Sequence, residues 1–147
     1  MLNIGTQTKL TRVMNAVAAG TSDQNGSIID MKGFEGCAFI VAFGTITAGA
    51  VTSIKVQQGA ASDMSDAADL LGTSVAVAAD DDNQIAAIEV VRPRERYVRV
   101  VVDRGTQNAV IDGAIAIQTG PKEEPTTHDA TTVVGSETHL SPAEGTA

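Results

Sequence analysis

The chain has 147 residues and a formal net charge of −8, from 18 Asp and Glu against 10 Lys and Arg. This length is typical of one domain and suffices to bury a core without a disulfide or a metal. The acidic balance argues against nucleic acid or an anionic membrane as a partner, because both need clustered basic side chains. The single cysteine, Cys37, lies in an apolar run and is predicted to be a small buried residue rather than a catalytic thiol.

Aromatic residues make up only 3% of the chain, so the core is expected to be thin and filled mainly by Val and Ala. No apolar run reaches the length of a membrane span. The first residues lack the charged and then apolar layout of a secretion signal, so we expect synthesis in a reducing cytoplasm.

The first 26 residues are small and polar, with only a weak hydrophobic period. We expect residues 1–26 to form an edge strand or an arm, although Val13 and Val17 could also share one side of a short helix. The segment closes at Asn25-Gly26, a dipeptide that favours the positive φ of a tight turn.

Residues 27–121 carry the pattern of a β-sandwich domain. A continuous apolar run at 37–43 predicts a strand buried on both faces, whereas the alternation at 51–58 predicts a half-buried strand. The clearest alternation predicts that Val98, Val100 and Val102 point into the core. Short strands separated by turn signals indicate an all-β fold, a single β-sandwich or jelly-roll-like domain. The predicted strands are 27–31, 37–43, 51–58, 73–78, 84–91, 96–103 and 109–118.

The character of the sequence changes after Gly120-Pro121. Residues 122–147 are rich in Thr, Glu, Ala, Ser and Pro, and one Lys against five acidic residues gives them a net charge of −4. Such a segment cannot bury enough apolar surface to offset its ordering entropy. We therefore expect an extended C-terminal tail that reaches a neighbouring subunit, anchored by its few sizeable apolar residues; packing of the tail on its own domain is the alternative. These candidate anchors are Val133, Val134 and Leu140.

No arrangement of residues predicts catalysis, a metal or a cofactor. The run Asp80-Asp81-Asp82 resembles half of a calcium loop, but the glycine and glutamate that complete such a loop are missing, so a solvated turn is favoured. His128 and His139 lie in the polar tail without a cysteine partner. We therefore expect a protein that is not an enzyme. A second acidic set, spaced by three and a weaker metal signal, is Asp63, Asp66 and Asp69.

Four arginines form the only basic cluster of the sequence. They are solvated charges that protect a strand edge, or a patch that forms salt bridges with an acidic protein surface; the pattern leaves both interpretations open. The candidate interface residues are Arg92, Arg94, Arg96 and Arg99.

The segment Arg96-Tyr97-Val98-Arg99-Val100-Val101-Val102, together with Gly33-Phe34-Glu35 and Val56-Gln57-Gln58, resembles a family of small tailed-bacteriophage virion proteins. The resemblance covers about residues 27–121. Members are similar to capsid decoration, or cement, proteins with a jelly-roll-like fold. The resemblance implies a non-enzymatic protein on the outer capsid surface of the virion, made in the bacterial host cytoplasm. The implied partners are the major capsid protein and further copies of the chain, with a trimer favoured over a dimer.

Two other functions remain open at this point. One is a head–tail completion or tail structural protein, and the other is a carbohydrate-binding β-sandwich. Sugar sites often use aromatic platforms, and Tyr97 is the only tyrosine in a chain without tryptophan.

Overall fold

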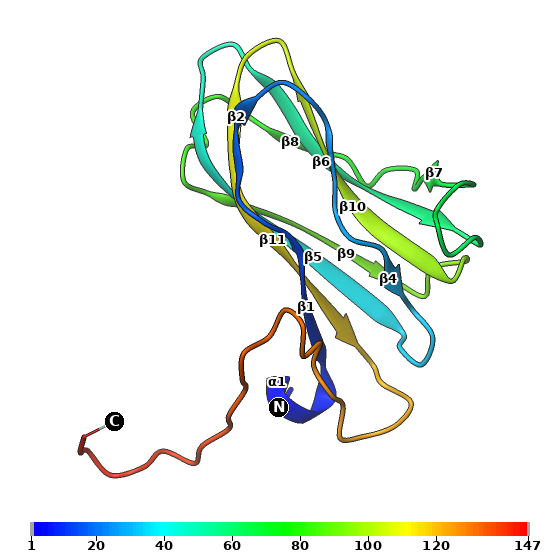
Figure 1. The fold of residues 1–147 in the computed structure, drawn as a ribbon, viewed down its shortest axis with the longest axis vertical. Helices are drawn as coiled ribbons and strands as arrows, with labels where there is room; N and C mark the ends of the chain where they lie inside the picture. Colours follow the sequence, from blue (N-terminus) through cyan, green and yellow to red (C-terminus); the bar gives the residue numbers. More distant parts are fainter. Residues whose placement is uncertain (1, 147) are drawn as a thin grey trace.

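Two antiparallel sheets pack face to face in the computed structural model, which describes residues 2–146 (Figure 1). Sheet A has the strand order β1-β11-β5-β9, with β2 also paired to β11. Its strands are β1 (Lys9–Met14), β2 (Val17–Gly20), β5 (Gly36–Ile46), β9 (Ile85–Val91) and β11 (Ala109–Thr119). The predicted all-β sandwich is confirmed.

Sheet B has the strand order β3-β10-β6-β7, with β4 also beside β10 and β8 beside β6. Its strands are β3 (Gln24–Asn25), β4 (Ile29–Asp30), β6 (Val51–Gly59), β7 (Ala68–Asp69), β8 (Val75–Val77) and β10 (Tyr97–Gly105). One helical turn, α1 (Ile4–Gln7), precedes β1, and the Asn3 side chain caps it by accepting from the Gly5 amide. No helix within residues 2–146 is long and apolar enough to cross a membrane.

The core lies between the two sheets and follows the alternation of the strands. In β10, Val98, Val100 and Val102 are fully buried, which confirms their predicted direction. From the opposite sheet, β5 contributes Phe39 and Phe43 together with smaller residues. Burying these side chains stabilises the domain at roughly 25 cal/mol for each Å² of apolar surface removed from water.

The prediction that the run 37–43 is buried on both faces is wrong. Cys37, Phe39 and Val41 point into the core and are fully buried, but Ala38, Ile40 and Ala42 are only half-buried. The second set lies on the outer side of sheet A, where the sandwich has no third layer. The apolar run is therefore continuous because both faces are apolar, although only one face meets the core.

The N-terminal segment contains more strand than its sequence pattern shows. Within 1–26 the chain forms α1, β1, β2 and β3, so the expected edge strand is present as β1, which pairs with β11. By contrast, the predicted strand at 27–31 shrinks to β4. The strands predicted at 51–58, 84–91 and 109–118 correspond to β6, β9 and β11 with small shifts at their ends.

A buried arginine joins the two sheets at the end of the sandwich near β2. Arg104 of β10 is only 5% exposed, and its guanidinium donates to the carbonyls of Ser22, Ala18 and Ala109 at 2.7, 3.0 and 2.8 Å. The Arg104 amide also donates to Asp23 Oδ1 at 2.9 Å. One side chain thus holds β2, the β2–β3 turn, β10 and β11 together.

Candidate interaction surfaces

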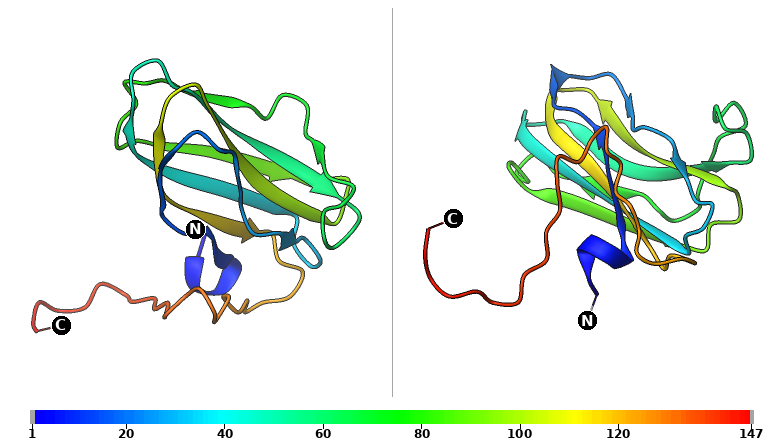
Figure 2. Two further views of the ribbon diagram at one scale, coloured as in Figure 1. Left: turned by 45° about the horizontal axis from the view of Figure 1, so that its top comes forward. Right: turned by 60° about the horizontal axis from the view of Figure 1, so that its bottom comes forward.

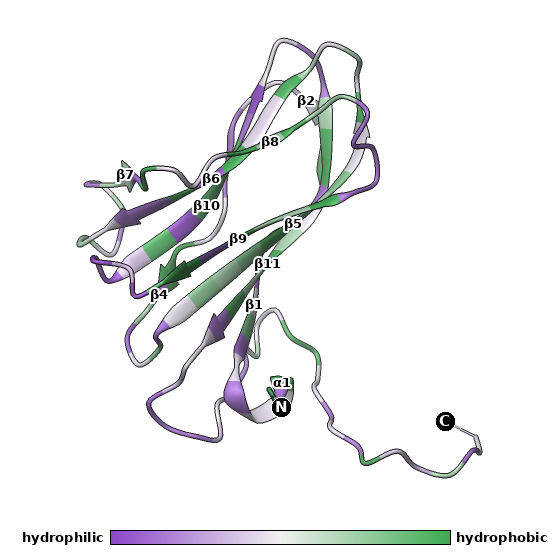
Figure 3. Ribbon diagram, turned by 180° about the vertical axis from the view of Figure 1, so that it is seen from behind, coloured by the Kyte–Doolittle hydropathy of each residue, from purple (hydrophilic) through white to green (hydrophobic). Residues whose placement is uncertain are grey.

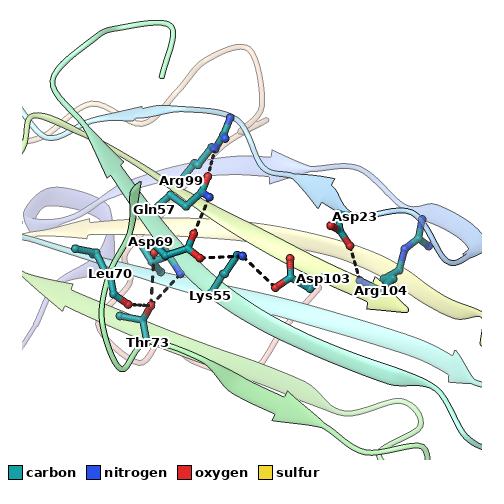
Figure 4. Close-up of polar contacts among 10 residues, drawn as sticks. Asp23, Lys55, Gln57, Asp69, Leu70, Thr73, Arg99, Asp103 and Arg104 are labelled. Carbon is teal, nitrogen blue, oxygen red and sulfur yellow. Dashed lines mark hydrogen bonds and ion pairs between the residues drawn. The ribbon is translucent and has the colours of Figure 1, made fainter. Parts of the chain in front are cut away.

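The outer face of sheet B carries a connected set of polar side chains (Figure 4). Lys55 Nζ lies 3.0 Å from Asp69 Oδ2 and 3.3 Å from Asp103 Oδ2. The Gln57 amide donates to Asp69 Oδ1 at 2.7 Å, and Arg99 Nε donates to Gln57 Oε1 at 2.9 Å. We call this set the polar ladder; its side chains are joined to one another by hydrogen bonds and ion pairs.

The electrostatics of the polar ladder agree with its geometry. Hydrogen bonds from Gln57 and then from Lys55 hold the pKa of Asp69 below its usual value. In turn, the hydrogen bond to Asp69 raises the pKa of Lys55. Both groups therefore stay ionised at neutral pH, and sheet B presents water with a charged, internally paired surface.

The outer face of sheet A is chemically the opposite. In Figure 3 the central strands β5 and β11 are mainly white to green, whereas purple segments recur on β6 and β10. Three of its side chains are open to solvent: Ile85 is 68% exposed, Val91 62% and Ile115 41%. We call this surface the aliphatic face. Its apolar residues are Ala38, Ile40, Ala42, Ile85, Ala87, Val91, Ile115 and Ile117.

Strand pairing arranges the aliphatic face in rows. One row runs from Leu10 across Ile117 and Ala38 to Glu89, and the next runs from Arg12 across Ile115 and Ile40 to Ala87. A third row, of Gly113, Ala42 and Ile85, follows.

A hollow of about 280 Å³ interrupts the aliphatic face beside Gly113, where a glycine leaves no side chain to fill the surface. Arg12, Ile40 and Ile115 lie around it, and Asp112 lies at its rim.

Two opposite charges lie at opposite edges of the aliphatic face. Arg12 is on β1 and Glu89 is on β9, with β11 and β5 between them. Both are exposed, and neither forms an ion pair with any residue from 2 to 146. The Arg12 side chain makes one long hydrogen bond, from Nε to the Met14 carbonyl at 3.4 Å. Each charge is therefore available to a partner molecule.

The first part of the C-terminal tail lies along the free edge of β1. The Leu10 amide donates to His128 Nδ1 at 3.1 Å, and the Asp129 amide donates to the Leu10 carbonyl at 3.2 Å. The Arg12 amide donates to Thr132 Oγ1 at 3.1 Å. The hypothesis that the whole of 122–147 leaves its own domain therefore needs correction, because residues 128–132 satisfy backbone groups of β1 and Thr126 is hydrogen-bonded to Thr6 and Thr8 just before it.

The rest of the tail leaves the sandwich in both views of Figure 2, and on its way it passes α1, where Thr138 Oγ1 donates to Asn3 Oδ1 at 3.3 Å. Val133 is half-buried where the tail leaves β1, but Val134 and Leu140 are fully exposed. We call residues 134–146 the arm. Of the three candidate anchors, two therefore lie on the arm without an apolar neighbour, and one lies at its root.

The four candidate arginines do not form one patch. Arg96 is bound by both oxygens of Asp30, at 2.8 and 2.6 Å, and lies 5.2 Å from the centre of the Tyr97 ring. This hydrogen bonding lowers the pKa of Asp30. Arg99 belongs to the polar ladder. Arg92 lies 3.8 Å from Glu35, and both Arg92 and Arg94 are exposed in the loop between β9 and β10.

The acidic runs accept hydrogen bonds from backbone amides of their own loops or of a neighbouring strand. Asp82 Oδ1 accepts from the Ile46 amide at 2.6 Å, and Asp81 Oδ2 accepts from the Ala78 amide at 2.8 Å. Asp63 and Asp66 likewise accept backbone amides of the β6–β7 loop. In the part of the chain from 2 to 146, no three His, Cys, Asp or Glu residues lie where they could hold a metal ion together.

Sequence reasoning missed the aliphatic face and its two charges. A signal was present in β11, where Ala114, Ile115, Ala116 and Ile117 show no polar alternation. A strand without polar positions has two apolar faces, and a two-layer sandwich covers only one of them.

Comparison with known proteins adds no relative, because no family model and no curated protein matches this sequence.

Proposed function

We propose that this protein is a structural, non-enzymatic component of a tailed-phage virion, which binds the outer surface of the capsid and cements the shell. The observation that supports this best is the arm. Its apolar residues Val134 and Leu140 are fully exposed, while its root at 128–132 is hydrogen-bonded to β1. A segment that is hydrogen-bonded to its own domain and still exposes its apolar side chains suits attachment to a second protein.

The strand order supports the same assignment. Counting β1 with β2, β3 with β4 and β7 with β8 as single interrupted strands leaves eight strand positions. Their order is 1-8-3-6 in sheet A and 2-7-4-5 in sheet B. This order supports the expectation of a jelly roll, an architecture found in viral capsid domains.

Charge favours the outside of the shell. The chain carries a net charge of −8, so packaged DNA on the inner side would repel it. We propose that the arm lies in a groove of the major capsid protein. Binding only the assembled shell would then stabilise that shell by mass action.

The small number of aromatic side chains disfavours a carbohydrate-binding function. Tyr97 lies beside the Arg96 guanidinium, which occupies the position that a sugar ring would need.

The test uses phage heads stripped of this protein and the purified full-length chain. A Val134→Asp, Leu140→Asp double variant removes both anchors, and a Ser136→Asp, Ser141→Asp variant adds the same charge while keeping them. We expect the wild type and the serine variant to co-sediment with the heads and the anchor variant to stay in the supernatant. Failure of the wild type to bind would overturn the proposal. Binding by the anchor variant would show that the arm is not needed for attachment.

Electron microscopy of the decorated heads separates the remaining structural alternative. Density over the whole shell supports decoration. A single ring at one vertex would instead identify a head–tail completion protein.

A further inference from the structure

The aliphatic face of sheet A is an apolar surface that the rest of the domain does not cover. It lies on the opposite side of the sandwich from the polar ladder, so one outer face is adapted to water and the other is not. Exposure of 68% at Ile85 and 62% at Val91 places large aliphatic groups in solvent on a regular sheet. An exposed apolar patch of this kind marks a contact with another molecule.

We propose that a second copy of this chain packs on the aliphatic face, sheet against sheet, about a two-fold axis that runs along the strands between β11 and β5. Such an axis exchanges the two sides of the sheet, so that β9 of one copy lies over β1 of the other. The pairing goes beyond the proposed capsid role and does not depend on it.

The shape of the face fits this axis. Ile85 on β9 is in the same row as Gly113 and Ala42. The two-fold therefore carries Ile85 of one copy to the β1 side of the same row in the other copy. The hollow of about 280 Å³, which lies over Gly113 of β11 and is bordered by Arg12 of β1, is next to that position. The most exposed side chain of the face thus meets the main depression in it.

The charges fit the same axis. Arg12 and Glu89 lie at opposite edges, about 14 Å apart across three strand spacings, and two residues apart along the strands. The two-fold places each Arg12 on the same side as Glu89 of the other copy, with an offset of about 7 Å along the strands. In the single chain the Arg12 side chain reaches toward Met14 and Gly113, away from the row of Glu89. Entry of Ile85 beside Gly113 displaces it, and the turned Arg12 side chain together with that of Glu89 can span the offset. Among residues 2–146 neither charge has an ion pair, and the pairing gives each one a counter-charge.

The charges on the aliphatic face also favour a second copy of the chain as its partner, rather than an acidic protein surface of the kind expected for the arginine cluster. An acidic partner would repel Glu89, and a basic partner would repel Arg12. A self-complementary face satisfies both, as an isologous interface requires. The symmetry differs from the trimer expected from the phage resemblance.

The size of the face limits the strength of the pair. With the row of Thr119, Gly36 and Val91 beyond the first of the three rows, the face has four strands and four rows. These cover about 20 Å by 20 Å, or about 400 Å² for each copy. A standard interface buries about 800 Å² on each partner. The pair is therefore expected to be weak and to dissociate in the micromolar range or above.

The first experiment measures the mass of the full-length protein by sedimentation equilibrium up to about 1 mM. We expect a reversible monomer–dimer equilibrium. Ile85→Asp should abolish the dimer, whereas Val51→Asp, at an equally exposed position (67% against 68%) on sheet B, should leave it unchanged. Circular dichroism confirms that each variant is folded. A monomer throughout, a trimer, or equal effects of the two substitutions would overturn the proposal.

The second experiment tests the charge pairing. Arg12→Glu and Glu89→Arg should each weaken self-association about tenfold, because each places like charges together twice. Mixed in equal amounts, the two variants should form a mixed dimer at least as tight as the wild type, since every contact then joins opposite charges. If the mixture associates no better than either variant alone, the proposed two-fold is refuted. The monomeric variants are also tested for binding to phage heads, so that a loss of self-association is distinguished from a loss of capsid binding.

Discussion

Replacing Arg104 with methionine tests whether one buried cation holds the end of the sandwich together. Methionine keeps much of the buried aliphatic volume but removes the three guanidinium hydrogen bonds to Ser22, Ala18 and Ala109. Hydrogen bonds to a charged group each contribute about 1.5–3 kcal/mol. Water can reach the carbonyls of exposed Ala18 and Ser22, but not that of fully buried Ala109.

Relief of the buried charge offsets part of this loss, so we expect Arg104→Met to lower the free energy of unfolding by about 2–4 kcal/mol. Urea unfolding followed by circular dichroism measures it, as a shift of the midpoint by about 1–2 M with an unchanged slope. Arg94→Met, on an exposed loop side chain, is the matched control and should change little. A loss below about 0.5 kcal/mol for Arg104→Met would refute the conclusion that this side chain holds the end of the sandwich together.

Three further predictions concern the tail, the thiol and one ion pair. Truncation after Gly135 should leave the melting temperature nearly unchanged, whereas truncation after Pro121 should lower it, because only the longer deletion uncovers the β1 edge; equal melts would contradict the docking of 126–132. Burial raises the pKa of the Cys37 thiol to about 12, so a thiol reagent at neutral pH should label the unfolded chain but not the folded one. The hydrogen bond from Arg96 lowers the pKa of Asp30 below its ordinary value of 3.8, so the stabilising pair is intact above that pH and lost as the pH falls below it. The stability difference between wild type and Asp30→Asn should therefore vanish in acid, and a difference that persists there would contradict this account.

Alternation predicted strands correctly where one face meets the core and the other meets water. In β6 and β10 the outward positions include Lys55, Gln57 and Arg99, so the period of two is visible in the sequence. In β5 and β11 the outward positions are aliphatic, and the period disappears. The run 37–43 therefore resembled a strand covered on both sides, because the sequence shows that a face is apolar but not what covers it.

The contacts of the chain ends had no local signal at all. Leu10 and His128 are 118 positions apart, and their hydrogen bond joins a backbone amide to a ring nitrogen. The role of Arg104 was missed for a similar reason, since its acceptors are backbone carbonyls, which any residue provides. The candidate anchors Val134 and Leu140 were found because an apolar residue in a polar segment is visible without knowledge of the fold.

The docking of the tail on β1 brings both chain ends to the same end of the sandwich, while the turn between β5 and β6 lies at the far end (Figure 1). In a particle attached through the arm, that turn would point away from the shell. The turn contains Gly49 at a positive φ of 83°, and its neighbours Thr47 and Ala48 are exposed. Under the proposed function, a foreign peptide for display on particles is therefore expected to be tolerated in this turn, whereas a fusion beside the arm would stand between the protein and the shell.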